Sequence, residues 1–240
     1  AGAVLIHNLR AVLPKGRRQR GVKDPQRRKE HMSSNSSSKV HRITRLAILV
    51  AIIFLLSFTP LGYVVVGPIA GTTIQMPVIV GAVLMGPVSG AILGFFFGLS
   101  AVIKVLTMPG ADPFATLALA HSPLAYLAVC LGARILMGWL SGLLGAALKK
   151  LPVFQGKKSV ISYGITGFVG SAMNTLFYLG GLWLLCSSTI AQYYGIDLSG
   201  VGGFVMSAAA TLGTPEAILS CIVVAAVCKA LEALEHRLSM

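Results

Sequence analysis

The stretch that decides the fold covers residues 72–106 and reads TTIQMPVIVGAVLMGPVSGAILGFFFGLSAVIKVL. It contains one charged residue, Lys104, close to its far end. The Gly86-Pro87 pair predicts that one helix ends there and another begins, because proline is poorly tolerated inside a helix. The first helix, residues 74–85, is too short to cross about 30 Å of hydrocarbon at about 1.5 Å per residue, whereas the second, residues 88–106, is long enough.

Three glycines recur every four residues in the second helix: Gly90, Gly94 and Gly98. Residues at this spacing share one helix face, so that face carries no side-chain bulk. In water such a run weakens a helix, but in a membrane it lets a neighbouring backbone come close. The stretch therefore predicts a polytopic membrane protein whose packing centre is this helical hairpin.

The composition agrees with a membrane bundle. The chain has 240 residues, 55% of them hydrophobic and 11% charged, against about 25% charged residues in soluble domains. The net charge of +13 does not indicate nucleic-acid binding, because nine of the 20 basic residues precede Met32 and the others follow membrane topology. The cysteines lack CxxC or metal-ligand spacing, so we interpret them as small buried hydrophobic residues: Cys130, Cys186, Cys221 and Cys228.

The first 38 residues differ from the rest in being basic, polar and aperiodic, and they end in a Ser-rich run at residues 33–38. Two interpretations remain open. Residues 1–38 are a disordered cytoplasmic tail, or the segment before Met32 is an artefact and Met32 is the true start. In both, residues 39–240 form one membrane domain of six helices.

The expected fold class is an all-α integral membrane protein with six transmembrane helices. Beyond the central hairpin, helices are predicted at residues 43–58, 123–148, 160–186 and 214–229, with a short extra helix at 200–212. Residues 59–73 carry no charge and five Gly or Pro residues, which predicts a strand-like or re-entrant connection. Residues 107–122 are expected to form a loop, in which Ser122 caps a helix that begins at Pro123.

The placement of charge orients these helices. Lys and Arg residues flank the first span, fill the loop between the fourth and fifth spans and lie near the C-terminus. The loops after the first, third and fifth spans contain neither. Because Lys and Arg concentrate on the cytoplasmic side of a membrane, we expect both termini in the cytoplasm.

The sequence lacks the signatures of common enzymes. It contains no HExxH, GxSxG or Walker A motif, and its acidic residues are too few and too scattered for a paired-carboxylate site. We therefore expect no catalytic residue and no metal site. What remains is a group of isolated polar residues inside or at the outer ends of the spans, where polar side chains are costly and usually functional.

These residues predict a polar cavity that opens outward beneath the uncharged first loop, although each also has a structural interpretation. Lys104 is close enough to a span end to extend to the interface. Arg134 is too deep for this and needs a partner or a polar cavity. Asn174 suits an interhelical hydrogen bond, and Glu216 suits the positive end of a helix dipole. The candidates at this stage are Gln75, Lys104, His121, Arg134, Asn174, Tyr178 and Glu216, and Thr72 is a further polar residue towards the outer side.

Several segments resemble the substrate-binding S components of energy-coupling factor (ECF) vitamin transporters, over about residues 42–235. They are residues 59–62 (TPLG), 75–87 (QMPVIVGAVLMGP), 90–99 (GAILGFFFGL), 170–175 (GSAMNT) and 214–218 (TPEAI). The pantothenate-type branch is the most similar, on the Asn174-Thr175 pair and on Pro215-Glu216-Ala217-Ile218.

The resemblance implies a membrane-embedded subunit that captures a vitamin from outside, with pantothenate favoured. It implies delivery through a complex with a membrane scaffold subunit and two ATPase subunits in a prokaryotic plasma membrane. ATP is used by those partners, so no cofactor is expected in this chain. The expected polar contacts are Gln75, Asn174, Thr175, Tyr178 and Glu216, with Lys104, His121 or Arg134 on the carboxylate.

The resemblance also gives an interpretation of Ala47 and Ala51, which lie on one face of the first span. In the S components an Ala-x-x-x-Ala on the first helix forms part of the surface that docks on the scaffold. The pair is equally compatible with ordinary packing between helices within the bundle.

Three other functions stay open. An S component for folate, riboflavin, thiamine or a pyrimidine precursor would ask for more aromatic stacking than the few outer aromatic residues offer. A self-sufficient secondary transporter usually shows internal repeats, and residues 43–148 and 160–236 show none. The last possibility is a membrane assembly subunit that binds no ligand.

Overall fold

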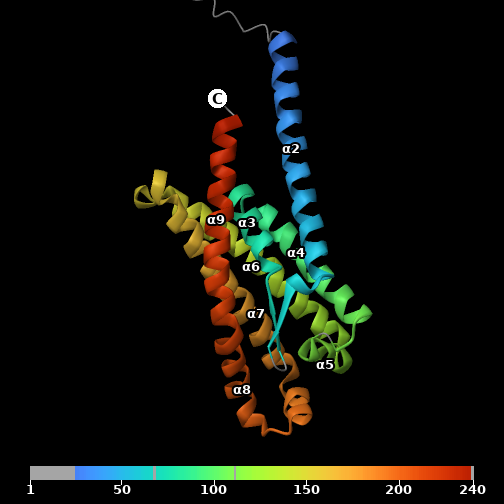
Figure 1. Ribbon diagram of the computed structural model, residues 1–240. Helices are drawn as coiled ribbons and strands as arrows, with labels where there is room; N and C mark the ends of the chain where they lie inside the picture. Colours follow the sequence, from blue (N-terminus) through green and yellow to red (C-terminus); the bar gives the residue numbers. More distant parts are fainter. Residues whose placement is uncertain (1–24, 67–68, 111, 239–240) are drawn as a thin grey trace, which may run out of the picture. The chain divides into compact units, whose positions relative to one another are not determined.

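The computed structural model describes residues 25–66, 69–110 and 112–238 (Figure 1). The chain divides into two units, Ala1–His41 and Arg42–Met240. Helix α2 (Pro25–Ser57) already begins ahead of the Ser-rich run. Of the tail expected for residues 1–38, residues 1–24 lie outside the described residues. The contacts discussed below all belong to the second unit.

The second unit is an all-α membrane bundle with one small β-hairpin. Among the described residues, five helical segments are long and apolar enough to cross a membrane, and α3 is shorter, as its sequence predicts. After α2 the order is β1 (Tyr63–Val66), β2 (Ile69–Thr72), α3 (Gln75–Met85), α4 (Pro87–Thr107), α5 (Pro113–His121), α6 (Pro123–Lys150), α7 (Ser159–Tyr194), α8 (Val201–Ala208), a π-helical turn (Ala209–Gly213) and α9 (Thr214–Leu238).

The predicted break between α3 and α4 lies at Gly86. Its φ of 89° costs glycine little, and its N–H still donates to the Ala82 carbonyl at 2.9 Å. Pro87 then starts α4, where a missing N–H does no harm. From the end of α6, the Nζ of Lys149 donates to the Val83 carbonyl at 2.7 Å, which brings a hydrogen-bond donor and a positive charge to the C-terminal end of α3.

The glycine face of α4 packs against α6. A Cβ added to Gly90 would lie 2.2 Å from the carbonyl oxygen of Gly138, and one added to Gly94 would lie 2.2 Å from that of Arg134. The two main chains are therefore in direct contact, and this contact gains dispersion energy that bulkier residues would forbid. It also sets the depth of Arg134 relative to α4.

The connection predicted to be strand-like is a two-stranded antiparallel hairpin, in which Tyr63 of β1 lies opposite Thr72 of β2. Its base is closed by Thr73, whose N–H donates to the Gly62 carbonyl at 3.1 Å and whose hydroxyl donates to the Leu61 carbonyl at 2.7 Å. Because α3 begins only three residues after β2, the hairpin is tied closely to the start of that helix.

Residues 113–121, which were expected to lie in a loop, form helix α5 instead. Asp112 accepts the N–H of Ala115 at 3.1 Å, and Pro113 occupies the first helical position. Both features favour a helix start. The same pair of signals at Ser122 and Pro123 begins α6, as predicted. The expectation of a loop was wrong, because Asp112 and Pro113 start a helix in the same way as Ser122 and Pro123.

Two other boundaries are informative. α7 continues to Tyr194, past its expected end at Cys186, but Cys186 has the non-helical angles φ −128° and ψ 16°. The predicted end therefore marks a kink within a longer helix. The extra helix expected at residues 200–212 corresponds to α8 and the π-helical turn, and α9 begins at Thr214 as predicted.

Helix α2 is the least buried span, since only 11% of Val40–Ser57 lies inside the protein. Two of its hydrogen bonds reach α4, one near each end of the apolar segment Val40–Ser57. The Ser57 hydroxyl donates to that of Ser100 at 2.8 Å, and Nη2 of Arg42 donates to the Ser89 hydroxyl at 2.9 Å. Most of the surface of residues 42–57 therefore faces away from the bundle.

Gly138→Ala should destabilise the bundle, because its Cβ would lie 2.1 Å from the Gly90 carbonyl oxygen, a backbone atom that cannot turn aside. Overpacking of this kind typically costs about 1–3 kcal/mol. Gly132→Ala on the same helix is the matched control, because its Cβ meets nothing within 4 Å. Thermal unfolding in detergent should show a lower Tm for Gly138→Ala alone; equal Tm values would contradict the packing argument.

Candidate ligand-binding site

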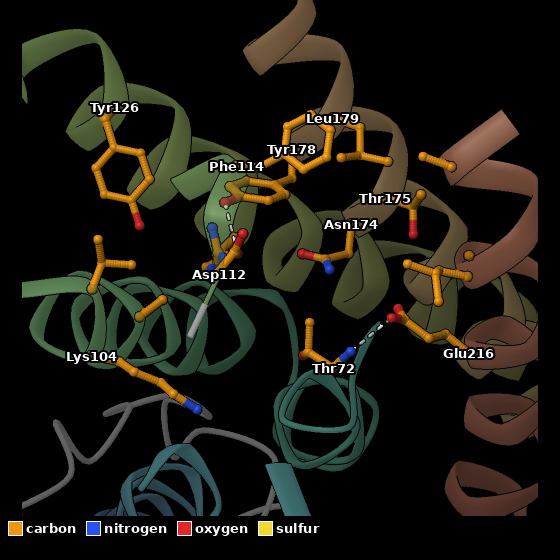
Figure 2. A pocket seen from close by; sticks show the side chains of 16 residues that line it. Thr72, Lys104, Asp112, Phe114, Tyr126, Asn174, Thr175, Tyr178, Leu179 and Glu216 are labelled. Atoms are coloured by element: carbon orange, nitrogen blue, oxygen red, sulfur yellow. Dashed lines mark hydrogen bonds between the residues drawn. The ribbon is translucent and has the colours of Figure 1, made fainter. Parts of the chain in front are cut away.

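One cavity brings together side chains from β2, the loop before α5 and the helices α4 to α9 (Figure 2). It encloses about 50 Å³. A water molecule needs at least about 10–15 Å³, so the space admits a few waters. The lining side chains that are polar or aromatic are Thr72, Lys104, Asp112, Phe114, Tyr126, Arg134, Asn174, Thr175, Tyr178 and Glu216.

Arg134 brings a buried positive charge to this cavity, with only 5% of its surface exposed. Its guanidinium carbon lies 4.7 Å from the ring centroid of Phe97 and 4.6 Å from that of Tyr178. Its Nη1 donates to the Cys130 carbonyl at 2.9 Å. The two rings hold the guanidinium by cation–π attraction, which orients the charge without neutralising it. Such a group is suited to a carboxylate or phosphate.

Asp112 is an acidic residue whose charge interacts with that of Arg134. Its Oδ1 accepts the Ala115 N–H, and its Oδ2 accepts the Tyr178 hydroxyl at 3.5 Å (Figure 2). Burial raises the pKa of Asp112 above its ordinary value, while the Ala115 amide, Arg134 and Tyr178 pull it in the opposite direction. Asp112 and Arg134 therefore bring opposite charges to the same cavity.

Glu216, at the start of α9, forms the wall on the hairpin side. Its Oε1 accepts the backbone N–H of Thr72 at 2.7 Å (Figure 2), and its Oε2 accepts Nε2 of Gln75 at 3.1 Å. The same Nε2 donates to the Ser171 hydroxyl of α7 at 2.7 Å. A single polar network therefore links the end of β2, the start of α3, α7 and α9.

Three buried polar atoms at or beside the cavity have no hydrogen-bond partner among the described residues. They are the hydroxyl oxygen of Thr72 and the side-chain carbonyl oxygens of Gln75 and Asn174. Gln75 is 0% exposed and Asn174 is 4% exposed. Since buried polar groups are nearly always paired, these atoms indicate a site that a polar ligand or ordered water completes.

Six of the eight candidate residues surround this one cavity: Lys104, Arg134, Asn174, Thr175, Tyr178 and Glu216. Gln75 lies behind the wall, where it contacts Glu216. His121 requires a correction, because it ends α5 as an exposed residue and does not line the cavity. The helical course of α5 accounts for the difference, since a loop would have left the position of His121 open.

Among the polar and aromatic lining residues, three were not selected from the sequence: Asp112, Phe114 and Tyr126. Asp112 followed by Pro113 is a signal for a helix start, and a helix predicted there would have included Asp112 and Phe114 among the candidates. Tyr126 precedes Arg134 by two helical turns, a spacing that places both on one side of α6. Thr72 had been placed towards the outer side from the sequence, and the hairpin brings it to the cavity wall.

The cavity offers charge and hydrogen-bonding groups rather than metal ligands. Within the described ranges, no group of three His, Cys, Asp or Glu side chains is placed to hold a metal ion. The four cysteines are free thiols.

Comparison with known families identifies the class of protein. The family described as ECF transporter, substrate-specific component, matches residues 41–228, which is most of the chain. The chain belongs to this family. A comparison with curated proteins gave no match.

Membership in this family makes the chain a transporter subunit and not an enzyme. It is the membrane-embedded, substrate-binding subunit of an ECF transporter, which associates with ECF scaffold and ATPase subunits and takes a small-molecule substrate. The cavity around Arg134 and Asn174 is the candidate place for that substrate, because it combines a buried cation with hydrogen-bonding atoms that the protein leaves unpaired.

Asp112→Asn should make thermal stability less dependent on pH. Burial raises the folded-state pKa of Asp112 above its ordinary value of 3.8, so the protonated form favours the folded state. This contribution is complete below the ordinary pKa and is lost as pH rises through the raised one. Asn keeps a side-chain acceptor for the Ala115 N–H but does not titrate. In Tm measurements from acidic to neutral pH, wild type should lose stability relative to the variant; parallel curves would refute this.

Proposed function

We propose that this chain captures pantothenate from outside the cell and presents it to an ATPase-driven ECF complex. The observation that carries the proposal is a buried guanidinium, Arg134, next to unpaired amide and hydroxyl oxygens in one cavity. Pantothenate has a carboxylate at one end, an amide in the middle and two hydroxyls at the other end. A cation, an amide and hydroxyl-binding groups in sequence match that chemistry.

In this proposal the carboxylate is bound at the side of Arg134 and Lys104. The ligand amide pairs with Asn174, whose side chain offers both a donor and an acceptor. Thr175 and Tyr178 supply hydroxyls, and Glu216 and Gln75 form the wall nearest the ligand hydroxyls. Because the enclosed space is about 50 Å³, the walls must move apart to admit a vitamin.

The distribution of charge supports an orientation with both termini in the cytoplasm of a prokaryotic cell. Lys149 at the end of α6 lies against Tyr163 near the start of α7, with Nζ 5.5 Å from the ring centroid. Arg45 near the cytoplasmic end of α2 pairs with Glu235 of α9 at 2.6 Å. Basic residues thus gather at one end of the bundle, as the positive-inside rule requires. The ligand cavity then opens on the outer side.

Docking on the scaffold subunit is proposed to use the face of α2 that carries Ala47 and Ala51. Both residues are exposed. Small side chains let another helix approach closely, and little of this helix is engaged within the bundle. ATP hydrolysis by the partner ATPase subunits supplies the energy, so this chain needs no cofactor of its own.

A second candidate substrate class is a vitamin with an aromatic ring, such as folate, riboflavin, thiamine or a pyrimidine precursor. One observation favours it: Phe114, Tyr126 and Tyr178 all line the cavity, more aromatic surface than the sequence led us to expect. Tyr178 already stacks on Arg134, which leaves Phe114 and Tyr126 for a ring.

Pantothenate should raise the Tm of the purified, detergent-solubilised chain in a panel that also contains folate, riboflavin, thiamine and a pyrimidine. A ligand at 100 times its Kd adds about 2.7 kcal/mol of stability, which a thermal-shift assay detects easily. A Tm shift with a different vitamin would identify that vitamin, and not pantothenate, as the substrate. The absence of any shift would overturn the proposed site.

Arg134→Met provides the matched control for that assay. Loss of a charged hydrogen bond should weaken pantothenate binding by roughly 10- to 100-fold. Panthenol, in which an alcohol replaces the carboxylate, should bind wild type and variant about equally. If the variant binds pantothenate and panthenol more weakly by the same factor, Arg134 stabilises the fold and does not bind the carboxylate.

Ala51→Trp should prevent assembly with the scaffold while leaving ligand binding intact, because the bulky ring would keep the partner helix away. Leu184→Trp is the control, since Leu184 is 75% exposed on α7, away from α2. Co-purification with the scaffold and ATPase subunits measures assembly, and the thermal shift measures binding. Assembly that survives Ala51→Trp would place docking elsewhere.

A further inference from the structure

Glu216 occupies an unusual position for a residue expected to touch the ligand, because both of its carboxylate oxygens already accept hydrogen bonds from the protein. One donor is the main-chain N–H of Thr72, which no choice of side chain can remove. The other is Gln75, which is fully buried. The carboxylate is thus directed at the junction between β2 and α3.

The hairpin needs such a partner. It has only two strands, so each strand has one edge without a neighbour, and the N–H groups on that edge require acceptors from elsewhere. At Thr72 the acceptor comes from Glu216, which lies 144 positions later in the chain. This bond holds the last residue of β2 against the first turn of α9.

Thr72 is also the residue through which the hairpin reaches the cavity. It lines the cavity, and its hydroxyl oxygen is buried without a partner among the described residues. Its backbone is therefore fixed by Glu216, whereas its side chain is left for whatever occupies the cavity. Figure 2 shows this arrangement, with the Thr72 backbone linked to Glu216 at the edge of the cavity.

We propose that Glu216 is a positioning residue, which fixes Thr72 in the cavity wall, and that the Thr72 hydroxyl binds a polar group of the substrate. The second half rests on the proposed ligand site; the first half does not. Glu216 then acts on ligand affinity through the hairpin and not by contact. A positioning role can be distinguished from a direct ligand contact, because a positioning Glu216 must stabilise the hairpin even when no ligand is bound.

Hydrogen exchange of the ligand-free protein tests the first half. In Glu216→Ala, amides of residues 69–73 should exchange at least about tenfold faster, because a hydrogen bond to a carboxylate is lost. Glu216→Gln should restore slow exchange, since its amide oxygen still accepts the Thr72 N–H. Asn174→Ala is the matched control. Asn174 lines the same cavity from α7, and its side-chain carbonyl oxygen has no hydrogen-bond partner among the described residues, so this variant should exchange like wild type.

Unchanged exchange in Glu216→Ala overturns the positioning role, and so does equally fast exchange in Glu216→Gln. Thr72→Val tests the second half, because it keeps the N–H but lacks the hydroxyl. It should exchange like wild type and bind pantothenate roughly 5- to 10-fold more weakly. Unchanged affinity overturns that half. If wild type binds no pantothenate, the proposed function fails, and hydrogen exchange alone still decides the role of Glu216.

Discussion

The contact on which the rest of the structure depends is the direct approach of the α4 and α6 backbones. At Gly90 and Gly94 no side chain separates the two helices, so their main chains touch. Because Arg134 itself supplies one of the touching carbonyls, the same contact that packs the bundle places the guanidinium. Lys104 follows on α4, three helical turns beyond Gly94. Packing and ligand chemistry thus share one helix pair.

The opposite wall is held by polar rather than apolar contact. There the hairpin, α7 and α9 meet through Gln75, Ser171 and Glu216, with distances between 2.7 and 3.1 Å. Within a membrane such polar groups must form hydrogen bonds with one another, because the hydrocarbon offers no water as a partner. The cavity is therefore bounded by a close-packed wall on one side and by a hydrogen-bonded wall on the other. The hydrogen bonds of the second wall hold the hairpin against α7 and α9.

Much of the fold was predictable because its signals are local. The break at Gly86-Pro87, the glycine face of α4 and the start of α6 at Ser122 each depend on a few adjacent residues. The convergence of polar residues was also predictable, since polar side chains within apolar helices have few places to go. The link between Thr72 and Glu216 was not, because it joins a strand edge to a helix 144 positions away. Nor did the sequence place His121, whose position follows from the course of α5.

The sparse attachment of α2 has a consequence for how such subunits evolve. Among the described residues that line the cavity, none belongs to α2. Substitutions on its outward face can therefore adapt the subunit to a different scaffold without altering the pocket, and substitutions in the pocket can change the substrate without disturbing that face. The two surfaces are free to diversify independently, which is the condition for subunits of different substrate specificity to share one set of scaffold and ATPase subunits.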